Sequence, residues 1–292
     1  MRKDNSLLVG ILLTLLAGGL LACMDAIGKS LTLILPVIQV IWFRYFVQTV
    51  LVGTYLSWRT GTGFLRTRHP GLQILRGLCL LATTFLMYEA FKRVPLADAT
   101  AMLFFSPIMV TLLSVLFLRE RIGPHRIFAV LVGFGGMLLI LGPGFGRFEP
   151  ALGLALLASV SNALFLLLTR HLAGREDAAA TQFNTTISGA VILSFAVVPN
   201  WQTPDAATGL LLAAIGVFGT LGHFTLVRAF AHAPASLLSP FLYSQVLTAG
   251  LLSVALFGDP LRPAMVAGTA LLVASGVYIW WRENRRRLEA TV

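Results

Sequence analysis

The chain has 292 residues, of which 57% are hydrophobic and 12% are charged, and its mean hydropathy is +0.84. An ordinary soluble protein carries roughly 25% charged residues, so the composition excludes a water-soluble globule. The formal net charge of +10 would favour nucleic acid in a soluble protein. Here the distribution of the basic residues explains it better, and no nucleic-acid partner is expected.

Ten apolar segments follow one another along the chain, and each has the roughly 20 residues that a helix needs to cross a bilayer. Prolines mark many of the joints, because proline lacks a backbone donor and crowds the preceding turn. The sequence therefore predicts an all-α integral membrane protein. The ten predicted transmembrane helices are 6–28, 36–58, 72–92, 96–118, 124–142, 150–170, 180–199, 208–231, 235–257 and 263–282.

The basic residues predict the orientation of these helices. If the N-terminus is cytoplasmic, 16 of the 22 Lys and Arg residues fall on cytoplasmic segments. Only five fall on the outside, and Arg44 lies within a helix. This bias obeys the positive-inside rule and predicts that both termini lie in the cytoplasm.

An internal repeat appears when each residue is set against the residue 139 positions later. The matches occupy equivalent places in helices three to five and eight to ten. Five helices is an odd number, so the second copy enters the membrane from the opposite side, as in many secondary transporters. We therefore expect a first repeat at 1–148 and a second, inverted repeat at 149–292, around a central cavity. The matched pairs are Pro95 and Pro234, Leu112–Val115 and Leu251–Val254, Glu120 and Asp259, and Pro124 and Pro263.

Several motifs carry a resemblance to a known family. Each half has an acidic residue after an aliphatic run, in Phe117–Glu120 and Leu256–Asp259, and the first half continues into the Gly-rich Val132–Gly136. With Pro95–Ala99 and Phe105–Pro107, these features resemble the EamA-type branch of the drug/metabolite transporter superfamily. The resemblance implies a bacterial inner-membrane protein that moves a small metabolite. Members include bacterial amino-acid exporters and carriers for S-adenosylmethionine, riboflavin and drugs.

The inventory of chemical groups argues against catalysis. The chain has no Walker-type loop and no HExxH motif, and its five histidines lack metal-ligand spacing. The two cysteines, Cys23 and Cys79, lie inside apolar segments, where a thiol behaves as a small hydrophobe. We expect neither an enzyme nor a metal site or other cofactor.

Polar residues inside membrane spans are costly and usually face the interior of the bundle. Asp25 precedes Lys29 by four residues, which favours a local ion pair. For Arg44, a structural pairing with Asp25 or Glu89 competes with direct binding of a substrate carboxylate. The residues predicted to have structural or gating roles are Arg44, Asp25, Glu89, Pro95, Pro234, Glu120 and Asp259.

A second group of residues is predicted to line the central cavity. Asn162 is the only strongly polar side chain in its helix, where its amide either joins two helices or binds a ligand. Ser239 precedes a proline that breaks its helix. The residues predicted to bind substrate are Tyr88, Asn162, Tyr243, Met87, Ser239, Gln245 and His223.

Aromatic and methionine side chains with a few amides suit a zwitterion that has an apolar side chain. The leading hypothesis is therefore a monomeric secondary transporter that exports apolar or aromatic amino acids by alternating access. One alternative is a carrier for a cationic or nucleoside-like compound, such as S-adenosylmethionine, riboflavin or a quaternary ammonium. A membrane-embedded enzyme or scaffold is the third hypothesis.

Overall fold

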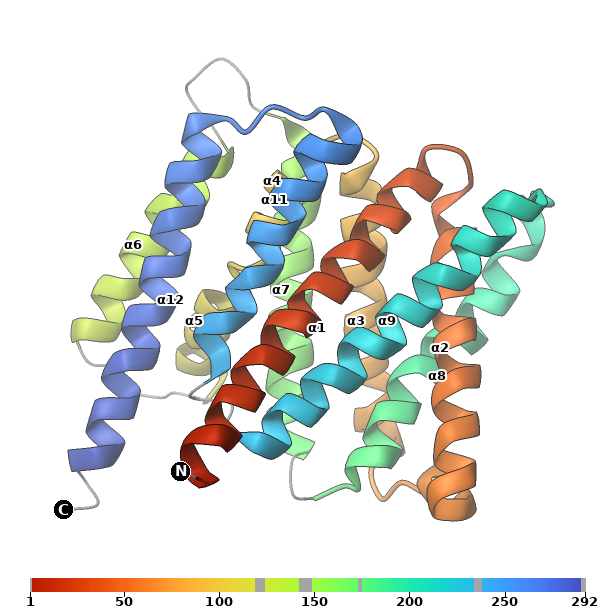
Figure 1. Ribbon diagram of the computed structural model, residues 1–292, viewed down its shortest axis with the longest axis horizontal. Coiled ribbons are helices and arrows are strands. Elements are labelled where there is room, and N and C mark those ends of the chain that lie inside the picture. The colour runs from red at the N-terminus through yellow and green to blue at the C-terminus, as the bar shows by residue number, and fades with distance from the viewer. Residues whose placement is uncertain (1, 119–123, 142–148, 173–174, 234–237, 290–292) are drawn as a thin grey trace.

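A computed structural model describes residues 2–118, 124–141, 149–172, 175–233 and 238–289. The long helices run roughly side by side through the molecule, and α1 begins at the same end at which α12 finishes (Figure 1). We call this the termini end, and the opposite end the remote end.

Successive spans alternate in direction along the chain, and α4 and α5 together form one of these spans (Figure 1). In the first half they are α1 (Arg2–Thr32), α2 (Val37–Thr60), α3 (Pro70–Phe91), α4 (Leu96–Leu103), α5 (Ser106–Leu118) and α6 (Pro124–Leu141), with the short 3₁₀ helix η1 (Gly61–Leu65) after α2. In the second half they are α7 (Pro150–Leu172), α8 (Ala178–Ala196), α9 (Ala206–His232), α11 (Ser244–Phe257) and α12 (Pro263–Glu289), with the 3₁₀ helices η2 (Val198–Asn200) and η3 (Ser239–Tyr243).

Within the described residues, each of the ten predicted apolar segments is mainly helical, which confirms an all-α multi-span membrane fold. Among the described residues, eight candidate spans are long and apolar enough to cross a membrane, and α6 contains a shorter apolar stretch. Two predicted helices are interrupted. The segment 96–118 breaks at Phe104 and Phe105, and within 235–257 the 3₁₀ helix η3 precedes α11. After these interruptions α5 starts at Ser106 and α11 at Ser244, which are 138 residues apart, one fewer than the 139-residue offset of the sequence matches.

Turn chemistry sets several helix ends. Pro36 and Pro95 occupy the N-cap positions of α2 and α4. Asp177 caps α8 by accepting a hydrogen bond from the backbone N–H of Ala180 (3.0 Å). Asp205 caps α9 in the same way, and the hydrogen bonds from Thr208 hold the pKa of Asp205 below its ordinary value. Gly258 ends α11 with φ +64, a conformation that suits glycine.

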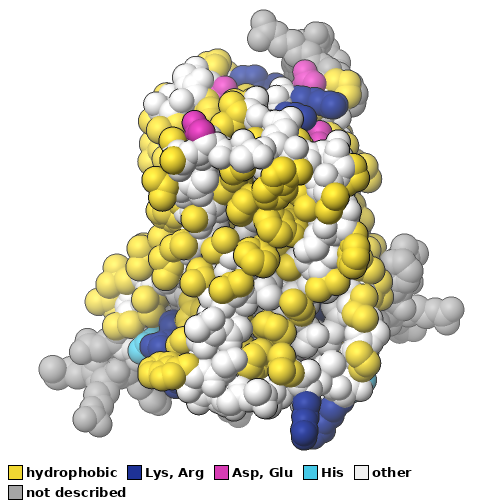
Figure 2. Space-filling model, turned by 90° about the vertical axis from the view of Figure 1, so that its right-hand side faces the viewer, with side chains coloured by type: hydrophobic (Ala, Val, Ile, Leu, Met, Phe, Trp, Pro, Cys, Tyr) yellow, Lys and Arg dark blue, Asp and Glu magenta, His cyan; other side chains and the backbone are white. Residues whose placement is uncertain are grey.

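The outer surface is apolar around its middle. Figure 2 shows hydrophobic side chains across the central part of one face, with Lys and Arg at its two ends and Asp and Glu at its upper end. Large apolar side chains such as Phe195, Leu210 and Leu251 are more than two-thirds exposed. In a membrane protein such side chains contact lipid tails, so this distribution agrees with helices that span the bilayer.

Helices α6 and α12 pack closely through a pair of glycines. A Cβ atom added at Gly136 would lie 2.7 Å from the backbone oxygen of Gly268, and one added at Gly268 would lie 2.5 Å from the oxygen of Gly136. Small residues permit this backbone approach between membrane helices. Gly135, the neighbour of Gly136, has open space at the corresponding position.

We predict that Gly136→Ala lowers the thermal unfolding midpoint of the detergent-purified protein, because overpacking against a backbone atom costs about 1–3 kcal/mol. Gly135→Ala is the matched control. It should keep or raise the midpoint, because alanine favours a helix by roughly 1 kcal/mol over glycine. Equal midpoints for the two variants would contradict the close α6–α12 contact.

Candidate functional site

Four helices bring polar side chains together inside the bundle. We call Asp25 of α1, Arg44 of α2, Tyr88 of α3 and Gln245 of α11 the central polar cluster. The amide of Gln245 donates from Nε2 to Oδ2 of Asp25 (3.0 Å), and Nη1 of Arg44 donates to the Tyr88 hydroxyl (3.3 Å). Asp25 and Arg44 are each only 7% exposed. The cluster therefore places two oppositely charged groups in the protein interior.

The two charged residues lie at matching depths. Asp25 is seven residues before the end of α1, and Arg44 is seven residues after the start of α2. At 1.5 Å per residue, both lie about 10 Å from the remote end of their helices. This depth is within the apolar part of a bilayer roughly 30 Å thick, where ionisable side chains usually mark a substrate or ion pathway.

The central polar cluster keeps unused hydrogen-bonding capacity. The Arg44 Nε atom is buried and has no hydrogen-bond partner among the described residues, and the same is true of the Ser244 hydroxyl, next to Gln245. Arg44 interacts electrostatically with Asp25, but the described contacts include no direct ion pair between them. An unpaired donor on a buried guanidinium is costly, so Arg44 is suited to receive an anionic group.

Aromatic side chains surround the cluster. The Tyr45 and Thr84 hydroxyls are hydrogen-bonded (3.2 Å), and the Tyr88 ring lies 5.5 Å from that of Phe91. Tyr88 packs directly on Gly28, where an added Cβ would lie 2.5 Å from the ring. The predicted site residue Met87 is buried beside Tyr88 in α3. Another, His223 of α9, is close enough to Arg44 to interact electrostatically.

Two predicted ion pairs are wrong. Lys29 does not pair with Asp25. Its Nζ atom reaches toward the remote end and pairs with Asp259 (3.0 Å), as expected for a long side chain that extends toward the membrane surface. Glu89 does not pair with Arg44 but lies 4.0 Å from Lys92, three residues along the same helix.

Other predicted site residues lie elsewhere. Asn162 of α7 donates to the Ser106 hydroxyl of α5 (3.1 Å) and so joins two helices. Tyr243 stacks near Phe104, with ring centroids 5.3 Å apart, and its hydroxyl lies against Gly276 of α12. Their roles in substrate binding stay predictions. Ser239 starts η3, its side chain is not described, and Glu120 and Pro234 lie outside the described residues.

Charged side chains tie several elements together at the remote end. We call Lys29, Asp98, Asp259 and Arg262 the charged closure. Lys29 bonds the backbone oxygen of Val94 (3.1 Å) as well as Asp259. Arg262 pairs with Asp98 (2.5 Å). The closure therefore links α1, α4 and the joint between α11 and α12.

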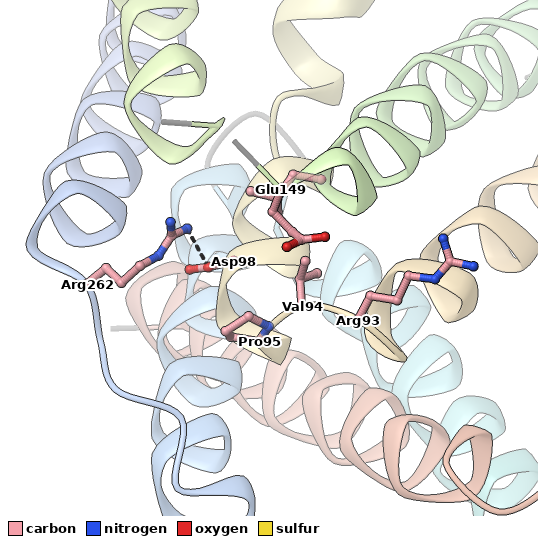
Figure 3. Close-up of a pocket in the computed structure, with 7 residues that line it drawn as sticks. Arg93, Val94, Pro95, Asp98, Glu149 and Arg262 are labelled. Atoms are coloured by element: carbon pink, nitrogen blue, oxygen red, sulfur yellow. Dashed lines mark hydrogen bonds and ion pairs between the residues drawn. The ribbon is translucent and has the colours of Figure 1, made fainter. Parts of the chain in front are cut away.

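A cavity of about 340 Å³ lies beside this closure. Figure 3 shows Arg262 reaching Asp98, with the Glu149 carboxylate at the start of α7 nearby and the Arg93 guanidinium pointing away from Asp98. Among the residues that the structure describes, no three His, Cys, Asp or Glu side chains are grouped so that they could hold a metal ion.

Sequence reasoning missed three of these charged groups. Arg262 is one of the five basic residues on outside segments and Asp98 lies within the Pro95–Ala99 motif, and neither has a predicted role of its own. Arg76 falls within the predicted helix 72–92 without a predicted role, yet in the structure it is 3% exposed and bonds Thr169 and the Thr181 carbonyl. A usable signal was present, because Gln73 lies one turn earlier on the same face and also bonds Arg76.

Comparison with known proteins identifies the family. The model of the EamA-like transporter family matches residues 8–142 and again residues 150–281. The chain belongs to the EamA-like transporter family. It is a multi-pass membrane protein of a family that transports small molecules, as the sequence resemblance predicted.

Similar proteins are named for different substrates. The chain is 26% identical to an S-adenosylmethionine uptake transporter of Rickettsia bellii, over 89% of each chain. It is 28% identical to a riboflavin transporter of Vibrio cholerae, over 98% of this chain and 97% of the relative. It is 30% identical to a pseudopaline exporter of Pseudomonas aeruginosa, over 80% of this chain and 82% of the relative. These names support a metabolite transporter and leave its substrate to be argued from the site.

A solved structure shares the fold. One crystal structure aligns with a TM-score of 0.63 at 20% identity, covering 98% of this chain and 99% of the other. At this identity the match supports the arrangement of the helices alone.

We predict that Arg262→Gln opens the charged closure. In a chain with Cys23 and Cys79 replaced by serine, a cysteine at the buried cavity residue Leu152 should react about tenfold faster with a water-soluble thiol reagent. This tenfold change is expected if the lost ion pair stabilised the closed state over the open state by about 1.4 kcal/mol. Arg93→Gln is the control, since Arg93 lines the same cavity without pairing with Asp98. Equal labelling rates in both variants would contradict a closing role.

Proposed function

We propose that this protein is a secondary transporter that exports amino acids with apolar or aromatic side chains across the bacterial inner membrane. The observation that carries the proposal is the buried, separated pair of charges in the central polar cluster. No described contact directly pairs Asp25 with Arg44, and Arg44 retains a free Nε donor. The α-carboxylate of an amino acid would bind Arg44, and its α-ammonium would bind Asp25.

Electrostatics favour a zwitterion at this position. A lone anion or cation would satisfy one of the two buried charges and leave the other unmatched, which is costly in a low-dielectric interior. A zwitterion satisfies both and adds no net charge to the cluster. The aromatic rings of Tyr45, Tyr88 and Phe91 supply apolar surface for the side chain of the substrate.

A carrier for a cationic or nucleoside-like metabolite is the second candidate. The Rickettsia bellii relative is named for S-adenosylmethionine, a compound that itself ends in an α-amino-acid group. The same charged pair would bind that group. Riboflavin has no such group, and a riboflavin carrier would therefore have no need of both Asp25 and Arg44.

Transport by alternating access requires two related arrangements of the bundle. We infer two inverted halves at 1–148 and 149–292, with both termini in the cytoplasm. Support comes from the two separate family matches and from the helices α5 and α11, which restart after an interruption at Ser106 and Ser244, 138 residues apart. In this scheme the charged closure seals the remote end, and its ion pairs break when the cavity opens there.

We predict that Arg44→Lys reduces amino-acid flux in proteoliposomes more than tenfold, because lysine cannot reproduce the geometry of a guanidinium bound to a carboxylate. Asp25→Asn should cause a similar loss. Arg59→Lys is the matched control on the same helix, since Arg59 is exposed and bonds only Tyr55 among the described contacts. The assay uses a panel of amino acids, S-adenosylmethionine and riboflavin, with and without a pH gradient.

The outcomes separate the hypotheses. Flux of amino acids that falls in Arg44→Lys and Asp25→Asn but not in Arg59→Lys supports the proposal. Flux of riboflavin alone, unchanged in both variants, would contradict the amino-acid site while keeping a transporter. Absence of flux for the whole panel in well-folded protein would contradict the proposed substrates altogether.

A further inference from the structure

A recess at the termini end gathers basic side chains. It has a volume of about 540 Å³ and lies between two joints, the segment after η1 and the segment between α7 and α8. We call this the basic recess. Its lining residues are Arg66, Thr67, Arg68, Arg175, Glu176 and Asp177.

The two acidic residues of the basic recess are already satisfied by protein donors. The Glu176 side chain is only 2% exposed, and one of its oxygens accepts from the backbone N–H of Arg68 (2.8 Å) and of His69 (2.7 Å) and contacts His69 Nδ1 (2.9 Å). Burial raises the pKa of Glu176, but these hydrogen bonds outweigh it and hold the pKa below its ordinary value. Asp177 is engaged as the cap of α8.

The arginines retain more capacity for an external ligand. Arg66 and Arg68 are exposed, and neither guanidinium has an ion pair among the described contacts. Among the described contacts, the Arg175 guanidinium bonds only the His171 ring (2.7 Å). The basic recess therefore presents guanidinium donors, while its carboxylates face inward or cap a helix. Guanidinium groups bind phosphate through paired, charge-assisted hydrogen bonds.

A buried arginine adds to the positive electrostatic potential of the basic recess. Arg76 lies about two turns below His69 on α3, is 3% exposed, and is held by Thr169 of α7 and the Thr181 carbonyl of α8. All of its described partners are uncharged, so no carboxylate cancels its charge there. One joint of the basic recess leads into α3, and the other connects α7 to α8. The positive charge of Arg76, which lies between these three helices, therefore strengthens the attraction of the basic recess for an anion.

The position of the basic recess points to lipid. Trp58, at the end of α2, is 84% exposed, and Leu65, directly before Arg66, is 54% exposed. Exposed tryptophan is typical of the boundary between the apolar bilayer and its headgroups. A basic pocket between membrane helices at that depth is a recognised type of lipid headgroup site. Beside these exposed apolar side chains, the arginines are suited to contact the lipid phosphates of one leaflet.

We propose that the basic recess binds the phosphate of an anionic phospholipid, with Arg66 and Arg68 as the principal donors. The bound headgroup bridges a joint of the first half to a joint of the second half, beside the Glu176–His69 contact. Lipid binding therefore stabilises the packing of α3 against α7 and α8. This proposal is independent of the substrate of the central polar cluster.

The test measures the thermal unfolding midpoint of the full chain in detergent micelles with added phosphatidylglycerol, phosphatidylcholine or inorganic phosphate. Phosphatidylglycerol should raise the midpoint by about 2–4 °C relative to phosphatidylcholine. Arg66→Gln with Arg68→Gln should abolish this rise, and Arg66→Lys with Arg68→Lys should keep most of it. Lys92→Gln with Arg93→Gln, which removes the same charge at the remote end, should keep all of it.

Three results would overturn the lipid site. The first is an equal effect of both lipids on the wild-type protein, a comparison that needs no variant. The second is a full rise in the double glutamine variant at the basic recess, or an equal loss in the remote-end control. The third is a rise with inorganic phosphate as large as that with phosphatidylglycerol, which would assign the recess to a soluble anion.

Discussion

The burial of Asp25 and Arg44 is the constraint on which the rest of the structure depends. Two charged groups about 10 Å inside a membrane protein each carry a desolvation cost of several kcal/mol. The fold offsets part of that cost with Gln245, Tyr88 and the polar hydroxyls nearby. Among the described residues, the Arg44 Nε donor has no hydrogen-bond partner. An arrangement that keeps buried charges without fully pairing them is suited to binding a ligand that completes the pairing.

Packing follows from this constraint. Tyr88 reaches Arg44 across α1 only because Gly28 leaves room for its ring. The interruption of the helix before Ser244 places Gln245 in the first turn of α11, from which it bonds Asp25. Toward the remote end, the charged closure joins α1 to α4 and to the α11–α12 joint. Helix α1 thus contributes both to the central polar cluster and to the charged closure.

The sequence predicted the ten apolar segments well, because membrane spans are marked by long apolar runs and by prolines such as Pro36 and Pro95 at their ends. It identified Asp25 and Arg44 as polar residues in unusual places, and it named Tyr88 and Gln245. It did not predict which of them meet. Spacing along one helix predicts an ion pair between Lys29 and Asp25, whereas the partner of Lys29 in the structure is Asp259, 230 residues away. Such pairings depend on how helices pack, which no local pattern encodes.

The central claim is that the Asp25–Arg44 pair recognises a zwitterionic α-amino-acid group. The most direct measurement is the thermal stabilisation of the wild-type protein by a transported amino acid, by its methyl ester and by its N-acetyl derivative. The account predicts stabilisation by the free amino acid and at least a tenfold weaker affinity for each derivative, since each lacks one of the two charges. Equal stabilisation by all three compounds would contradict it.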